Sequence, residues 1–198
     1  MSTLLPISYG PGLPDDSELR LCGDVNGRRV VELGASGGAA IAFAQRGAKA
    51  IVLDPSAAAL AAVRQRASEM GDDREIRVEC HAGDYADLGF APSASVDLVF
   101  SAGVLGAVDD LARVLRQAHR VLKPDTAFVC SLPHPFAAVL DGTTVARRYG
   151  TAGRTISELF MALTRANFAL DVLAEPDLAS SPAGVPPMLV IRARKLGV

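Results

Sequence analysis

A glycine-rich segment near the start of the chain has residue types that can bind a small charged ligand. It reads Val30-Val31-Glu32-Leu33-Gly34-Ala35-Ser36-Gly37-Gly38 and leads from an apolar run into a helical pattern. Glycines let a ligand approach the backbone at such a turn, because a side chain would block it. The helix start offers free N–H groups to a carboxylate, and Glu32 can hold an ammonium group and its waters.

Acidic and small residues follow at the ends of later apolar runs. Asp54 closes the second run, 20 positions after Gly34, where nucleoside-binding folds place an acid that accepts both ribose hydroxyls. Asp84 can accept a hydrogen bond from an adenine amino group, with Tyr85 or an apolar neighbour against the ring. The small residues of 101–103 allow the backbone itself to line a ligand.

Alternating apolar runs and helical patterns predict the elements that position these residues. Each apolar run is Val-, Ile- or Leu-rich, as in a parallel sheet covered on both faces. The expected strands are Arg29–Leu33, Ala48–Leu53, Ile76–Cys80, Val96–Phe100 and Ala127–Ser131. The expected helices are Gly38–Arg46, Ser56–Arg66, one capped by Asp109 or Asp110 and stopped by Pro124, and one opened by a Thr155–Glu158 capping box, with Ile156, Leu159, Phe160 and Leu163 inward.

The last part of the chain predicts a different kind of strand pairing. Phe168–Leu173 and Met188–Ala193 are separated by a loop-like stretch with four prolines, so they should form an antiparallel hairpin. The predicted fold class is therefore α/β, a three-layer sandwich with a seven-stranded, mostly parallel sheet and a C-terminal antiparallel hairpin. An NAD-type Rossmann domain would normally end in another parallel unit.

Taken in order, these motifs resemble those of class I, Rossmann-like methyltransferases that use S-adenosylmethionine (SAM), of the type 11-like kind. The resemblance lies in Glu-Leu-Gly-Ala-Ser-Gly-Gly, the terminal Asp54, Gly83-Asp84 and Val96-Asp97-Leu-Val-Phe-Ser101. Val121-Leu-Lys-Pro124 is similar to the family's entry into its fifth strand. The opening Tyr9-Gly-Pro…Leu19-Arg-Leu-Cys-Gly-Asp24 is similar to uncharacterised actinobacterial members.

The resemblance implies SAM as the cofactor and methyl transfer to an O, N or C nucleophile of a small molecule. The residues that would line the SAM site are Glu32, Gly34, Ala35, Ser36, Gly38, Asp54, Pro55, Ser56, Asp84, Tyr85, Ser101 and Gly103. The chain departs from the family at Ser36, where many members have glycine.

Two alternative functions remain at this stage. The first is an NAD-dependent oxidoreductase, which is disfavoured because Ser36 and Ala39 occupy glycine positions of the dinucleotide fingerprint. The second is a non-catalytic or partner-dependent SAM-binding protein, suggested by Ser36 and by the short segments available to form a lid.

Candidate substrate residues follow the fifth predicted strand. His134, between two prolines, could be a general base, or it could be a structural loop residue. Arg147, Arg148, Tyr149 and Arg154 could recognise an acidic small molecule or form a solvated basic turn. No metal-binding set of side chains is evident, and no metal is expected.

Composition sets the class of protein. With 49% hydrophobic and 21% charged residues, the chain should be globular. Its formal charge of −2 does not suggest the basic surface of a protein that binds nucleic acid or an anionic membrane. Three scattered cysteines and the absence of a signal-like or membrane-length apolar run favour a cytoplasmic protein.

A homodimer could complete the substrate pocket. We expect one domain over 1–198: a cap segment 1–27, a SAM-binding core 28–131, a substrate-region loop 132–154, and a last helix with the edge hairpin, 155–198.

Overall fold

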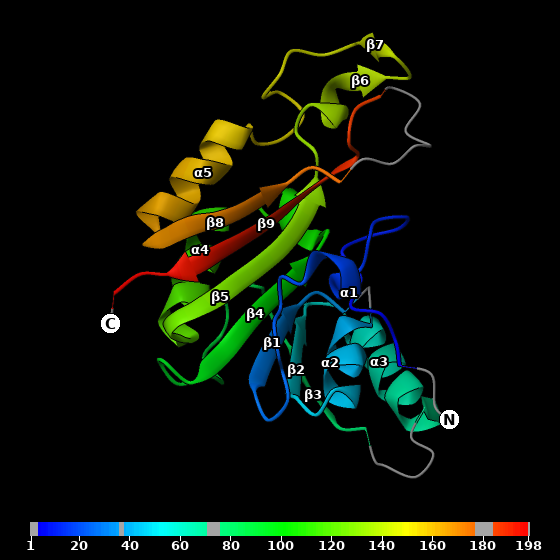
Figure 1. The fold of residues 1–198 in the computed structure, drawn as a ribbon, viewed down its shortest axis with the longest axis vertical. Helices are drawn as coiled ribbons and strands as arrows, with labels where there is room; N and C mark the ends of the chain where they lie inside the picture. The colour runs from blue at the N-terminus through cyan, green and yellow to red at the C-terminus, as the bar shows by residue number, and fades with distance from the viewer. Residues whose placement is uncertain (1–3, 36–37, 71–75, 177–183, 198) are drawn as a thin grey trace.

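The computed structural model of the protein describes residues 4–35, 38–70, 76–176 and 184–197. Its centre is a seven-stranded sheet in the order β3-β2-β1-β4-β5-β9-β8 (Figure 1). Strands β1 to β5 pair in parallel, and β9 pairs antiparallel with both β5 and β8. The predicted fold class and the C-terminal hairpin are therefore confirmed. The strands are β1 Arg29–Leu33, β2 Lys49–Asp54, β3 Val78–Ala82, β4 Val96–Ala102, β5 Leu122–Pro133, β8 Phe168–Ala174 and β9 Met188–Lys195.

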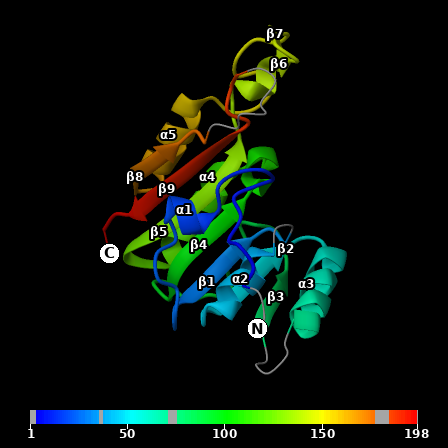
Figure 2. The ribbon, with the colours of Figure 1, turned by 45° about the vertical axis from the view of Figure 1, so that its right-hand side comes forward.

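Helices cover both faces of this sheet. The described helices are α1 Asp16–Leu19, α2 Ala39–Gln45, α3 Ala57–Met70, α4 Leu111–Val121 and α5 Ile156–Arg165, with short 3-10 turns η1 Val104–Ala107 and η2 Ala137–Val139. One hydrophobic cluster joins α2, α3 and the N-terminal segment to one face, and a second joins α4 and α5 to the other. Figure 2 shows α3 and α5 at opposite ends of the sheet. No helix in the described part of the chain is long and apolar enough to cross a membrane.

Local capping explains where two helices begin. The Asp110 side chain accepts a hydrogen bond from the Arg113 N–H at 2.8 Å, which makes it the N-cap of α4. The predicted capping box is present, because Thr155 and Glu158 each accept a hydrogen bond from the other's backbone N–H. Both predicted helix starts are confirmed.

The structure differs from the sequence predictions at several places. The helix predicted to be stopped by Pro124 ends at Val121, and β5 begins at Leu122, five residues before the predicted Ala127. β3 lies two residues later than predicted, as an edge strand with several partly exposed side chains. Phe160 was predicted to point inward, but it is 48% exposed. It lies on α5, which packs on the last strand of the sheet, so the outer flank of this helix has no further strand beneath it. A small second sheet, β6 Leu140–Asp141 with β7 Thr144–Val145, was not predicted.

Candidate functional site

The turn after β1 can be built only with glycine at Gly34. Its φ is +100°, which side chains rarely adopt, and its N–H donates to the Leu53 carbonyl of β2 at 2.9 Å. A Cβ atom there would lie 2.7 Å from Cγ1 of Val104, so η1 packs directly on the turn. Gly38, with φ of +71°, begins α2. Ser36 and Gly37 lie outside the described residues, so the prediction for Ser36 is not addressed.

Glu32 is a buried acid with one unpartnered oxygen. It is 1% exposed, and its Oε2 accepts a hydrogen bond from the Ala40 N–H at 2.7 Å. Within the described part of the chain, Oε1 has no hydrogen-bond partner. Burial raises the pKa of Glu32 to about 8, although the N–H groups of Ala40 and Ala39 act in the opposite direction. The expectation that the first turn of α2 leaves its N–H groups free is thus wrong for Ala40.

Asp54, at the end of β2, joins the two neighbouring turns. Its Oδ2 accepts from the Ala35 N–H at 2.8 Å, and its Oδ1 accepts from the Ser56 N–H at 2.7 Å. The Tyr85 hydroxyl also donates to Oδ2, at 3.4 Å. Burial, and then the charge of Asp54, raise the pKa of Tyr85 to about 12. Asp54 is 7% exposed, and its Oδ1 keeps capacity for a further donor, whereas Oδ2 already has two donors.

Three further predicted site residues, Asp84, Pro55 and Ser56, are exposed to solvent. Asp84 is exposed, and its Oδ1 accepts from the Ala86 N–H at 2.8 Å. Pro55 and Ser56 are exposed, and the Ser56 hydroxyl accepts from the Ala59 N–H at 3.2 Å in the first turn of α3.

At the end of β4, Ser101 is buried and hydrogen-bonded within the protein, whereas Gly103 borders open space. Ser101 is fully buried, and its hydroxyl donates to the Leu33 carbonyl at 3.0 Å, so its side chain ties β4 to β1. Gly103 has open space around it, since a Cβ there would meet nothing within 4 Å. All of these residues lie at or just beyond the edge at which the parallel strands end, called here the carboxyl edge.

His134 lies just beyond the carboxyl end of β5 and is only 5% exposed. Its Nδ1 accepts from the Phe136 N–H at 3.1 Å, so the hydrogen is on Nε2, which donates to Glu175 Oε1 at 2.9 Å. Its backbone N–H donates to the Pro187 carbonyl at 2.9 Å. Both ring nitrogens are occupied, so the predicted general-base role requires one of these hydrogen bonds to open.

The basic turn before α5 has three arginines with different environments. Arg154 donates to the carbonyls of Val108 and Asp109, just after η1. Arg147 donates to the Ala138 carbonyl at 3.3 Å. Arg148 is exposed, and its guanidinium has no hydrogen-bond or ion-pair partner among the described residues.

Sequence reasoning missed two residues of this region. Val104 packs on Gly34, and Glu175 binds His134 from 41 residues away along the chain. Neither has a local signal: Val104 is one small apolar residue in an apolar run, and the position of Glu175 depends on the C-terminal hairpin.

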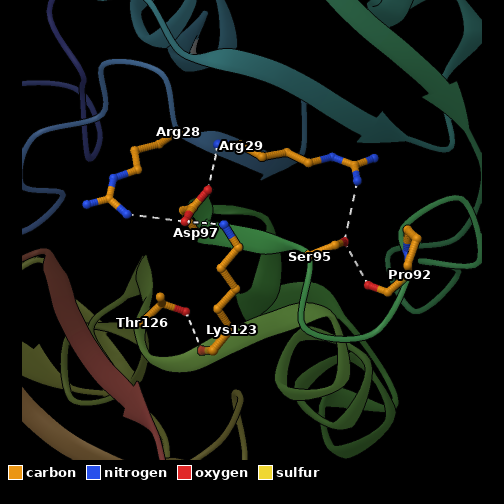
Figure 3. A network of polar contacts seen from close by, with 7 residues as sticks. All are labelled: Arg28, Arg29, Pro92, Ser95, Asp97, Lys123 and Thr126. Atoms are coloured by element: carbon orange, nitrogen blue, oxygen red, sulfur yellow. Dashed lines mark hydrogen bonds and ion pairs between the residues drawn. The ribbon is translucent and has the colours of Figure 1, made fainter.

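The opposite edge of the sheet, called here the amino edge, has its own buried carboxylate (Figure 3). Asp97 at the start of β4 accepts from the Arg29 N–H at 2.9 Å, Lys123 Nζ at 2.8 Å and Arg28 Nη1 at 3.3 Å. Burial alone would raise the pKa of Asp97, but these donors hold it below its usual value. This network joins the starts of β1, β4 and β5. No group of three or more metal-ligating side chains occurs in the described residues.

Comparison with known proteins gives a consistent result. Residues 31–130 match the sequence model of a family described as a methyltransferase domain. The fold is similar to a SAM-dependent methyltransferase from Mesorhizobium loti, with 25% identity and a TM-score of 0.72 over 89% of this chain and 95% of that chain. A SAM-dependent methyltransferase from Methanosarcina mazei has 18% identity and a TM-score of 0.69, over 90% and 96% of the two chains.

A third similar structure contains ligands. It is the 1,6-didemethyltoxoflavin-N1-methyltransferase of Burkholderia thailandensis, with bound 1,6-didemethyltoxoflavin and S-adenosylhomocysteine. The identity is 23% and the TM-score is 0.62, over 92% of this chain and 75% of that chain.

Proposed function

Because this chain belongs to the methyltransferase-domain family, we propose that it transfers the methyl group of SAM to an oxygen, nitrogen or carbon nucleophile of a small molecule. The protein is a SAM-dependent methyltransferase, and SAM is its cofactor. The small-molecule part of the proposal is supported by the weakly acidic net charge of −2, which does not favour nucleic acid as the acceptor.

The main observation behind the proposed site is the Oε1 atom of Glu32, which has no hydrogen-bond donor among the residues that the structure describes. A buried carboxylate oxygen without a donor costs free energy, so a fold that keeps one has a use for it. The positively charged ammonium group of SAM is a suitable donor for this oxygen once Glu32 releases the proton that its raised pKa lets it keep in the ligand-free protein. The residues present therefore fit the cofactor.

The other site residues have complementary roles in this proposal. Asp54 Oδ1 keeps acceptor capacity for one ribose hydroxyl, and Oδ2 can accept the other when the 3.4 Å hydrogen bond from Tyr85 opens. Tyr85 lies beside Asp54 for the adenosine part. Gly103 leaves backbone accessible where a side chain could block a ligand, and Gly34 allows the turn after β1 to pack directly against Val104. The remaining lining positions in the proposal are Ala35, Gly38, Pro55, Ser56, Asp84 and the backbone of Ser101, with Ser36 outside the described residues.

The chemistry needs little from the protein beyond positioning. When bound, SAM supplies a methyl carbon already activated by a positively charged sulfur. The protein has to align the acceptor atom in line with the sulfur–carbon bond and to exclude water. Alignment of this kind lowers a barrier by roughly 7–11 kcal/mol, so a dedicated base is optional. An O–H or N–H acceptor releases its proton to solvent or to a nearby base, and S-adenosylhomocysteine is the second product.

Calorimetric binding of S-adenosylhomocysteine, with NADH and NADPH as controls, tests the proposed site. The Asp54→Ala variant should bind about 1–3 kcal/mol more weakly, the usual range for a lost hydrogen bond to a charged group. Thermal unfolding of the variant without ligand shows whether the substitution has only damaged the fold. Unchanged affinity in Asp54→Ala would remove this residue from the site, and selective binding of a nicotinamide cofactor would contradict the proposal.

Incubation with labelled SAM and a cell extract tests the acceptor class. Label in a small molecule that chromatography separates from unreacted SAM, and that does not form without the enzyme, supports a small-molecule acceptor. Transferred label confined to protein or nucleic acid argues against one.

A further inference from the structure

The insertion between β5 and α5 exposes aromatic surface. Phe136 is 40% exposed and Tyr149 is 41% exposed, and Val145, which lies between them in the sequence, is 60% exposed. The chain has ten aromatic residues, and Phe160 on α5 is the other one with a large exposed fraction. Grouped apolar surface that water reaches is often a binding site, because burying it against a ligand is favourable.

Specific contacts hold the two rings close to each other. The ring centroids of Phe136 and Tyr149 are 6.4 Å apart with an interplanar angle of 51°, within the range of favourable aromatic pairs. The Tyr149 hydroxyl accepts from the Ile156 N–H at 3.0 Å, in the first turn of α5. The Phe136 N–H donates to the buried His134 at 3.1 Å. Anchored in this way, the rings lose little conformational entropy when a ligand binds.

Positive charge accompanies the aromatic pair. The stretch 134–154 contains three arginines and one acid, Asp141, in a chain whose net charge is −2. Arg147 and Arg154 donate to backbone carbonyls, whereas the Arg148 guanidinium has no partner among the described residues. The backbone of Arg148 is held, because its carbonyl accepts from both the N–H and the hydroxyl of Thr151. A free guanidinium on an ordered turn suits a planar anion such as a carboxylate.

Contacts through η1 connect this insertion to the carboxyl edge. The Arg154 guanidinium donates a hydrogen bond to the carbonyl of Val108, at the end of η1. Pro133 packs closely on Gly106 of η1, since a Cβ atom on Gly106 would lie 2.9 Å from Cδ of Pro133. At its other end η1 packs on the glycine turn through Val104. In Figure 1 the insertion, marked by β6 and β7, extends beyond the carboxyl end of β5. Both ends of the insertion, at Pro133 and Arg154, are therefore held on the segment that packs on the glycine turn.

We propose that Phe136, Tyr149 and Arg148 form the acceptor subsite and that the acceptor is a small aromatic acid. Its ring packs on Phe136 and Tyr149, and its carboxylate pairs with the Arg148 guanidinium. This inference rests on the proposed function, since it assumes that the methyl donor binds at the carboxyl edge.

The test is a binding titration by saturation-transfer NMR on the full chain saturated with S-adenosylhomocysteine. The probes are benzoate, 4-hydroxybenzoate and indole-3-carboxylate. Cyclohexanecarboxylate serves as a non-aromatic acid, and benzamide as an uncharged aromatic. At least one aromatic acid should bind about tenfold more tightly than either control, since each control lacks one of the two interactions.

Matched variants locate the subsite. Arg148→Gln should weaken binding of the aromatic acid about tenfold, and Phe136→Leu, which keeps apolar volume but loses the ring, about fivefold. Arg113→Gln and Phe160→Leu remove an exposed arginine and an exposed aromatic on α4 and α5 and should leave the affinity unchanged. Affinity for S-adenosylhomocysteine should be the same in all four variants.

Three results would overturn the inference: no aromatic acid binds, cyclohexanecarboxylate binds as tightly, or the control variants lose as much affinity as Arg148→Gln and Phe136→Leu. A wild-type protein that fails to bind S-adenosylhomocysteine would instead contradict the proposed cofactor site, so the two failures are distinguishable.

Discussion

The two edges of the central sheet each contain a carboxylate shielded from water, and the two are compensated differently. At the amino edge, Asp97 accepts from Lys123, from Arg28 and from the Arg29 backbone, so both of its oxygens are used (Figure 3). At the carboxyl edge, Glu32 is 1% exposed and one oxygen has no partner in the described part of the chain. A carboxylate whose donors all come from the protein stabilises the fold, whereas a carboxylate left without a donor is available to a ligand.

Glu32→Gln should give the largest effect, on binding. Once the amide oxygen accepts from Ala40, the amide NH₂ group replaces the unpartnered oxygen and faces the ligand's ammonium group, so two donors oppose each other. We expect S-adenosylhomocysteine to bind about 1.5–3 kcal/mol more weakly, which is roughly ten- to hundredfold. Calorimetry measures this, and the free energy of unfolding at pH 7 should not fall. If Glu32→Gln bound S-adenosylhomocysteine with full affinity, Glu32 would have a structural role and would not contact the ligand.

Asp97→Ala should have the reverse pattern. Its removal leaves the Arg29 N–H without its acceptor and unlinks Lys123 from β4, so the free energy of unfolding should fall by about 1–3 kcal/mol. The two cations are largely solvated and contribute little by themselves. Urea unfolding measures the loss, and affinity for S-adenosylhomocysteine should stay the same. If the affinity fell as much as the stability, the separation between the two edges would be wrong.

The smallest effect, taken over a single pH unit, is a pH dependence of opposite sign at the two edges, with a slope of at most about 1.4 kcal/mol per pH unit for one proton. Glu32 has a folded pKa of about 8, above its usual 4.5, so the folded state holds an extra proton between these values. Its contribution to stability is full below about pH 4.5 and is lost as the pH rises towards 8. The pKa of Asp97 is lowered from 3.8, so its contribution is present above that value and is lost in more acidic solution.

Urea midpoints from pH 3 to pH 8 measure both slopes. Relative to the wild type, Glu32→Gln should lose less stability between pH 5 and pH 8, and Asp97→Asn should lose less below pH 4. Parallel curves for the wild type and Glu32→Gln would show that Glu32 does not hold the extra proton.

Local signals were enough to predict most of the fold. The strands and helices follow from hydrophobic periodicity, and the starts of α4 and α5 follow from Asp110, Thr155 and Glu158, because a cap acts on the next few residues. Predictions were poorer at β3 and Phe160, where burial depends on which other element lies alongside. An edge strand and a peripheral helix have the same local patterns as central ones.

The same distinction applies to the candidate site. The sequence by itself determined the glycine turn at Gly34 and the placement of Glu32 and Asp54 at strand ends, because these depend on backbone geometry over a few residues. Only the tertiary structure decided which oxygen of Glu32 has no donor and that Asp97 has three. It also decided that His134 is held by Glu175 and that Phe136 lies beside Tyr149. These contacts join residues well separated along the chain, and their geometry exists only once the sheet and the segments around its edges have packed together.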